Sequence, residues 1–279
     1  MDIGVGLPSM TSGTPGSMAI RWAVEAEDAG FSSLSVLDRL AYPIYEPLAL
    51  LSAVASATTR VRLMANVLLA PTRETFMLAK QAATIQSLSD GRLVLGLGVG
   101  RRRDDYDVVA MGFGDRGRRF DGMLEQLDRM WRQEDLMLPA PIPPVPLMIG
   151  GQTDATVRRV AKWGVGWTSG GSRSLPDVAA FAARVREAWW EAGREGQPRI
   201  LALSYFSIGS EELSRQQTLA YYGFIGPRAQ DLAAAVPHDE EGILAIRDSS
   251  AGLGIDELTF IPTVSDIDQV KRLARIVFD

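Results

Sequence analysis

The sequence has no cysteine and only one histidine, and these two absences exclude several kinds of chemistry. Without cysteine there is no disulfide, no thiolate metal site and no cysteine nucleophile. Zinc sites generally need several histidine or cysteine ligands, so we expect no metal. The histidine, His238, stands among polar residues at 237–241, and we interpret it as a solvated loop residue.

An excess of basic charge and long hydrophobic runs are also lacking. The net charge of −5 and the isoelectric point of about 5.1 argue against a nucleic-acid partner. No stretch approaches the ~20 apolar residues that a membrane helix needs. Met1 and Asp2 lead directly into an apolar segment, without the basic and apolar regions of a signal peptide. We therefore expect a cytoplasmic protein with neither nucleic acid nor membrane as a partner.

What the sequence does contain is an alternation of strand and helix patterns. Eight short apolar segments are predicted strands, at 3–7, 34–37, 61–69, 92–97, 145–149, 165–168, 200–208 and 257–262. Segments with helical spacing lie between them, at 17–30, 47–58, 73–88, 115–131, 153–163, 176–192 and 265–277. Eight units of this length predict a single domain over residues 1–279, a closed parallel (β/α)8 TIM barrel.

The segment 209–254, between the seventh and eighth strands, is the largest region without a regular pattern. It holds Tyr221, Tyr222, Gly223 and Phe224, followed by Pro227. Long irregular segments are often functional lids. We therefore expect an insertion here that shapes the active site.

In such barrels the active site lies at the C-terminal ends of the strands. That rule selects five short segments, which contain Asp38 and Arg39; Ala65, Asn66 and Val67; Gly98, Gly100, Arg101 and Asp104; Gly150, Gly151 and Thr153; and Thr168. An amide such as Asn66 inside an apolar strand must find partners or costs about 1–3 kcal/mol, so it indicates a site or a backbone contact. Asp38 has two interpretations. It either hydrogen-bonds the polar edge of a ring-shaped ligand, or it has a structural role as a helix N-terminal cap or as the ion-pair partner of Arg39.

The glycine turns admit two interpretations. A strand, a glycine pair and a helix start at Gly150 and Gly151 would expose backbone N–H groups to a phosphate, or form only a tight turn. The turn at Gly98 and Gly100 would let a planar ligand approach the backbone. Arg101, directly after a strand, is either solvated or faces an anion.

Three blocks of sequence resemble the luciferase-like monooxygenases and deazaflavin-dependent oxidoreductases. The first is Ala29-Gly30-Phe31 with Val36-Leu37-Asp38, and the third is Ile149-Gly150-Gly151 with the glycine–tryptophan segment 164–167. The middle block is the most specific, with LAKQAAT at 78–84, LSDGR at 88–92 and LGLGVG at 95–100. The resemblance is strong over residues 1–170 and weak beyond.

The resemblance implies roles for the residues selected above. Asp38 and Arg39 would lie beside a flavin-type ring, and Ala65, Asn66 and Val67 behind it, where many relatives have a non-proline cis peptide. The following residues would line the ring or its side chain: Gly98, Gly100, Arg101 and Asp104. The phosphate would be held by Gly150, Gly151 and Thr153, close to Thr168.

Two departures from the family pattern bear on the reaction. Relatives often have histidine where this chain has Arg39, and the deazaflavin-dependent sugar-phosphate dehydrogenases have an acidic group where it has Arg101. With the acid–base pair missing, we expect the cofactor to do the chemistry, with Arg39 and Arg101 stabilising developing negative charge.

The cofactor and partners are expectations drawn from the resemblance. The compact chain, with many arginines near the expected mouth, favours coenzyme F420 over FMN. We expect a small-molecule substrate, a homodimer and a separate flavin or F420 reductase. The alternatives are an FMN-dependent two-component monooxygenase, a catalytically silent flavin-binding barrel, and a glycosidase, which would need two carboxylates such as Asp38 and Asp104 at suitable separation.

Overall fold

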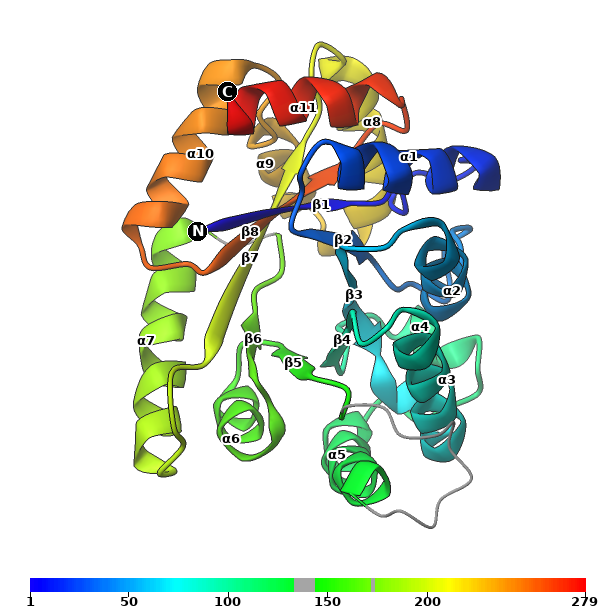
Figure 1. The fold of residues 1–279 in the computed structure, drawn as a ribbon, viewed down its shortest axis with the longest axis vertical. Helices are drawn as coiled ribbons and strands as arrows, with labels where there is room; N and C mark the ends of the chain where they lie inside the picture. Colours follow the sequence, from blue (N-terminus) through cyan, green and yellow to red (C-terminus); the bar gives the residue numbers. More distant parts are fainter. Residues whose placement is uncertain (133–143, 172–173) are drawn as a thin grey trace.

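The computed structural model describes residues 1–132, 144–171 and 174–279, and its strands close into a parallel barrel in sequence order. Figure 1 shows the strands at the centre and the helices around them. The strands are β1 (Asp2–Gly6), β2 (Ser33–Val36), β3 (Arg62–Leu69), β4 (Leu93–Gly98), β5 (Leu147–Gly150), β6 (Gly166–Thr168), β7 (Arg199–Phe206) and β8 (Glu257–Pro262). The predicted TIM barrel is confirmed.

The seven predicted helices begin and end close to the positions observed in the described residues. The helices are α1 (Gly16–Asp28), α2 (Pro47–Ala57), α3 (Thr75–Leu88), α4 (Asp104–Asp107), α5 (Arg116–Arg132), α6 (Asp154–Trp163), α7 (Leu175–Glu191), α8 (Glu211–Tyr222), α9 (Arg228–Ala234), α10 (Glu240–Gly252) and α11 (Asp268–Phe278), with short 3-10 turns η1 (Ala70–Thr72) and η2 (Gly223–Ile225). The sequence does not predict four of these helices, α4, α8, α9 and α10. The predicted starts at 73 and 265 are early by two and three residues, because Glu74 caps α3 and α11 begins only at Asp268.

Burial on both faces explains why the strands are continuous apolar runs. Every residue of β2, β5, β6 and β8 is buried. The helices contribute one apolar face each, as in α11, where Val270, Leu273 and Val277 pack into the core.

The segment 209–254 is mostly helical, so the prediction of an irregular region is wrong. It forms α8, η2, α9 and α10. Glycine and proline at Gly223, Gly226 and Pro227 break it into short helices, which hides the helical period in the sequence. Residues of α8 and the turn before α10, among them Tyr221 and Val236, pack against Met10, Tyr205 and Ile261 in a second apolar cluster.

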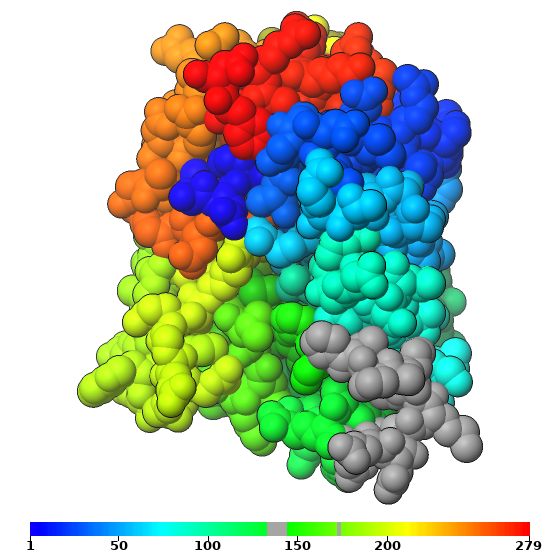
Figure 2. Space-filling view, in the orientation of Figure 1, coloured from blue at the N-terminus to red at the C-terminus, as the bar shows by residue number. Residues whose placement is uncertain are grey.

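The N-terminal ends of the strands are joined by a charged cluster. Glu257, which is 0% exposed, accepts hydrogen bonds from Ser32 at 2.9 Å, from Ser33, from Arg62 at 3.1 Å and from Arg199 at 2.8 Å. Both arginines also pair with Asp2. Figure 2 shows the first residues of the chain, in dark blue, against the orange α10 and the red α11.

Two expected absences can be compared with the described residues. None of their helices is long and apolar enough to cross a membrane. Within the same residues no group of three histidine, cysteine, aspartate or glutamate side chains could hold a metal ion.

His238 is not a freely solvated residue, because its Nδ1 lies 2.7 Å from the Ser207 hydroxyl and the residue is half-buried.

Candidate active site at the barrel mouth

An irregularity in β3 shapes the C-terminal ends of the strands, which we call the barrel mouth. Ala65 pairs with Leu95 and Leu68 with Leu97, so two residues of β3 oppose one of β4 between them. The peptide bond between these two residues, Asn66 and Val67, is cis, as the resemblance implied.

The glycines at the ends of β4 and β5 make room for Val67. A Cβ at Gly98 would lie 2.8 Å from Val67 Cγ2, and one at Gly150 would lie 2.7 Å from Val67 Cγ1. Real side chains do not approach this closely, so both positions are restricted to glycine by packing. Neighbouring segments of the predicted site therefore meet around Val67.

Asn66 carries a buried donor without a partner. Asn66 is only 3% exposed, and its side-chain Oδ1 accepts a 2.8 Å hydrogen bond from the Thr168 hydroxyl. Its Nδ2 has no hydrogen-bond partner among the described residues. The hydrogen bond from Thr168 therefore satisfies only the amide oxygen of Asn66, and the interpretation of Asn66 as fully satisfied within the barrel does not hold among the described residues.

Asp38 is neither a helix cap nor an ion pair with Arg39. Its Oδ2 accepts hydrogen bonds of 2.7 Å from the Leu69 backbone N–H and from Arg73 Nη1, while the buried Oδ1 has no partner among the described groups. Burial raises the pKa of Asp38, and the charge of Arg73 opposes that shift. Arg73 escaped prediction, although it follows the end of β3 by only four residues.

Arg39 is buried rather than solvated. Its side chain is 5% exposed, and its Nε lies 2.9 Å from the buried carboxylate of Asp105. The guanidinium carbon lies 5.5 Å from the ring centroid of Tyr42 and 5.3 Å from that of Tyr221. Neither Nη1 nor Nη2 has a hydrogen-bond partner in the described part of the chain, and Nη2 lies 3.7 Å from Asp104.

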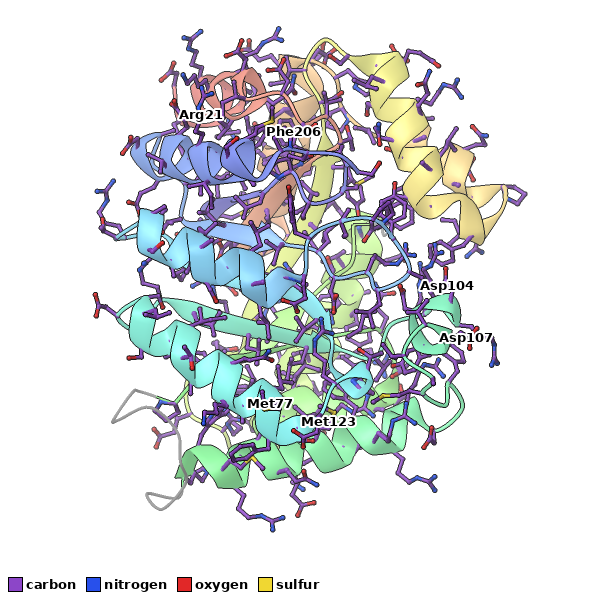
Figure 3. All side chains as sticks on the ribbon, turned by 90° about the vertical axis from the view of Figure 1, so that its right-hand side faces the viewer. Arg21, Met77, Asp104, Asp107, Met123 and Phe206 are labelled. Carbon is purple, nitrogen blue, oxygen red and sulfur yellow. The ribbon has the colours of Figure 1, made fainter. Side chains whose placement is uncertain are left out.

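Arg101 and Asp104, which are predicted to line the same part of the site, have different surroundings in the structure. Asp104, which lies in α4, pairs with Arg102, and this lowers the pKa of the carboxyl group. Arg102 stacks on Phe224 with its guanidinium carbon 4.1 Å from the ring centroid. In Figure 3, Asp104 and Asp107 lie on the side of the molecule that also holds the yellow α8. Arg101 instead lines a cavity together with Tyr205.

The predicted phosphate segment is a capped helix start. Gly151 has a φ of +121°, which favours glycine, and its carbonyl accepts a 2.7 Å hydrogen bond from Trp167 Nε1. The Thr153 hydroxyl caps α6 by accepting from the backbone N–H of Thr156. Asp154 places a negative charge in the first turn of α6, which works against an anion at that helix end.

The carboxylates are poorly arranged for a glycosidase. Asp38 and Asp104 are each paired with an arginine, Arg73 and Arg102 respectively. Burial raises the pKa of Asp38 and Arg102 lowers that of Asp104, so what sets this pair apart from a glycosidase site is the arginine held on each carboxylate.

A closed parallel barrel with buried, unpartnered polar atoms near the C-terminal ends of its strands has the architecture of a TIM-barrel enzyme, whose active site lies at those ends. The family model of the luciferase-like monooxygenases matches residues 1–257. The chain therefore belongs to the luciferase-like monooxygenase family, and it is an enzyme of the oxidoreductase class.

Similar sequences and structures agree with this assignment. An uncharacterized protein of Mycobacterium bovis is 30% identical over 223 residues, covering 67% of this chain and 77% of the relative. Pyrimidine monooxygenase RutA of Methylobacterium radiotolerans is 29% identical over 200 residues, covering 63% of this chain and 51% of RutA.

Two solved structures share the fold. An F420-dependent secondary alcohol dehydrogenase aligns with a TM-score of 0.81 at 17% identity, covering 100% of this chain and 99% of the other. The monooxygenase RslO1 of Streptomyces bottropensis aligns with a TM-score of 0.76 at 20% identity, covering 99% and 97%.

Proposed function

We propose that this protein transfers a hydride between coenzyme F420 and a small organic substrate. The observation that carries the proposal is the set of buried polar atoms without partners at the ends of β2 and β3. These are Asp38 Oδ1, Arg39 Nη1 and Nη2, and Asn66 Nδ2. An unsatisfied buried polar group costs about 1–3 kcal/mol, so several together indicate a polar ligand.

These atoms fit the polar edge of a flavin-type ring, which bears carbonyl oxygens and N–H groups. Asn66 Nδ2 and the Arg39 guanidinium would donate to ring oxygens, and Asp38 Oδ1 would accept from a ring N–H. Val67, backed by Gly98 and Gly150, would form an apolar wall against the face of the ring. When bound, the deazaflavin would supply or accept the hydride.

The chain's own contribution would be positioning and charge. Arg39 is fixed by Asp105, and Asp105 in turn accepts 2.9 Å hydrogen bonds from the backbone N–H groups of Leu40 and Ala41. A fixed guanidinium stabilises negative charge that develops nearby without reorganising. Arg101 would add a second positive charge, and the charges of both arginines act on the pKa of Tyr222.

The second candidate is an FMN-dependent monooxygenase that receives reduced flavin from a separate reductase. The similarity to pyrimidine monooxygenase RutA favours it. The same unpartnered atoms would hold either ring, because the two cofactors share the polar edge that these atoms would contact. The two candidates differ in the fate of the reduced cofactor in the presence of oxygen.

Titration under anaerobic conditions, followed by exposure to oxygen, tests both candidates. We expect reduced F420 to bind, measured by fluorescence quenching, and to stay reduced in air until a substrate is added. Tighter binding of reduced FMN and rapid oxygen consumption would instead favour the monooxygenase. If neither cofactor binds more tightly than about 100 μM, the proposed function is wrong.

A further inference from the structure

A cavity of about 850 Å³ lies between β7, the start of α7 and the helices of the insertion. Its apolar lining consists of Leu175, Leu203, Ile225, Leu232, Ala235, Val236 and Ile246. Its polar lining consists of Arg101, Ser174, Asp177, Ser204, Tyr205, Arg228 and Asp231. A space of this volume, with apolar walls and several polar groups, holds a small organic molecule.

The hydroxyl of Tyr205, in β7, forms a hydrogen bond with the hydroxyl of Tyr222, in α8. Each hydroxyl carries one proton, and the hydrogen bond between the two hydroxyls uses only one of these two protons. Neither hydroxyl makes another hydrogen bond among the described residues, so the second proton can be donated to a ligand. Tyr205 is 4% exposed, and a buried donor needs a partner.

The two phenols are neutral donors at ordinary pH. Burial raises the pKa of Tyr205 well above its usual value and also raises the pKa of Tyr222. The positive charge of Arg101 acts on both groups in the opposite direction, which puts that charge beside the pair.

We propose that the Tyr205–Tyr222 pair and Arg101 bind one oxygen of the substrate. The substrate is then a molecule with an apolar body that carries a carbonyl or an ionisable hydroxyl group. The apolar lining holds its body, and the pair donates to the oxygen while Arg101 favours negative charge on it. The inference deepens the proposed function and rests on it for the reaction, but the oxygen-binding site itself is independent of the cofactor.

Gly171 supports this geometry. A Cβ at this position would lie 2.6 Å from Tyr205 Cε2 and 3.2 Å from its hydroxyl oxygen. The glycine therefore leaves space for the phenol at the cavity wall. Gly171→Ala would displace the ring of Tyr205 while keeping both hydroxyl groups.

The probe for this site is 4-nitrophenol, whose ionised form absorbs visible light, and 4-nitroanisole is the matched ligand without an ionisable oxygen. We expect the protein to bind 4-nitrophenolate and to lower the apparent pKa of the probe. Tyr205→Phe, Tyr222→Phe and Gly171→Ala should each weaken 4-nitrophenolate binding about tenfold and change 4-nitroanisole binding less than about twofold.

Tyr106→Phe is the matched control. Tyr106 is buried too, but its hydroxyl donates to the Val99 carbonyl and it does not line the cavity, so binding of both probes should be unchanged. Because Tyr222 is only half-buried, its variant should fold even if Tyr205→Phe does not. Equal losses for both probes, or no loss in any folded variant, would overturn the inference. Cofactor titration is a separate measurement, so protein that discriminates the probes but binds neither cofactor would refute only the proposed function.

Discussion

The two ends of the barrel differ in how completely their buried polar and charged side chains are hydrogen-bonded. At the N-terminal ends, both oxygens of Glu257 are hydrogen-bonded, to two serines and two arginines from other parts of the barrel. At the C-terminal ends, Asp38, Arg39 and Asn66 are also buried, yet each keeps at least one polar atom without a partner among the described residues. The buried carboxylate at one end is fully paired by the protein, and the groups at the other end keep polar atoms that a ligand would pair under the proposed function.

This difference separates residues that stabilise the fold from residues that serve function. Complete pairing is what a buried charge needs if it is not to destabilise the protein. Unpaired groups persist where a ligand compensates for them. Substitutions at the two ends should therefore separate effects on unfolding from effects on binding.

The largest effect is expected at the N-terminal end. Glu257→Ala would leave Arg62 and Arg199 without their buried partner and remove the acceptor of Ser33. We expect a loss of about 3 kcal/mol in the free energy of unfolding, measured with urea. Cofactor affinity of the folded variant should be unchanged, because the cluster lies at the far end of the strands.

Asp2→Ala is the control for this prediction. Asp2 pairs with the same arginines, but its side chain is 46% exposed, so its loss should destabilise the protein by less than about 1 kcal/mol. If Glu257→Ala and Asp2→Ala had equal effects, the burial of Glu257 would not be what makes the cluster stabilising.

The next effect concerns the rate of the reaction. Arg39→Ala should slow cofactor oxidation by substrate about 10²-fold in single turnover, since it removes a fixed positive charge beside the reacting atoms. Arg92→Ala is the matched control. Arg92 is a partly buried arginine, but it bonds the backbone carbonyls of Ala55 and Thr58 and lies directly before β4, away from the mouth. Arg92→Ala should lower the free energy of unfolding and leave the single-turnover rate unaltered. A decrease of less than tenfold in the single-turnover rate of Arg39→Ala would contradict a catalytic role for Arg39.

Asn66→Ala should have a smaller effect, and on binding rather than stability. The variant loses the bond from Thr168 but also the unpartnered Nδ2, so the free energy of unfolding should change by less than about 1 kcal/mol. Affinity for the reduced cofactor should fall about tenfold, measured by fluorescence quenching. Unchanged affinity together with a large loss of stability would make Asn66 a structural residue.

The contrast between the two ends also explains what could be predicted from the sequence. Parallel strands buried on both faces leave an unmistakable apolar run, and the rule on strand ends then selects positions such as Asp38 and Asn66. The short α4 and the helices of 209–254 could not be predicted, because α4 has only four residues and the glycine and proline residues at 223–227 interrupt the helical pattern.

The partners of the site residues could not be predicted either. Arg39 and Asp105 are 66 residues apart, and Tyr205 meets Tyr222 across 17 residues and two elements. Such pairs follow from the directions of side chains after the barrel has closed, which local sequence does not contain. The motif Tyr221–Phe224 was visible in the sequence, but only the structure places it on Arg39 and Arg102.

The smallest expected effect returns to a carboxylate whose partners are complete. Glu27 accepts hydrogen bonds from the backbone N–H groups of Thr59, Arg60 and Val61, directly before β3. Burial alone would raise the pKa of Glu27, but these hydrogen bonds outweigh it and lower the pKa. A carboxyl group with a lowered pKa in the folded state stabilises the protein above its unfolded pKa, and that contribution is lost as the pH falls through the folded value. Glu27→Gln should therefore reduce the free energy of unfolding by about 1 kcal/mol at neutral pH, and the difference from the parent should shrink at about pH 4 and below. Urea unfolding across this range measures both, and profiles that stay parallel from neutral to acidic pH would show that the Glu27 charge contributes nothing to folding.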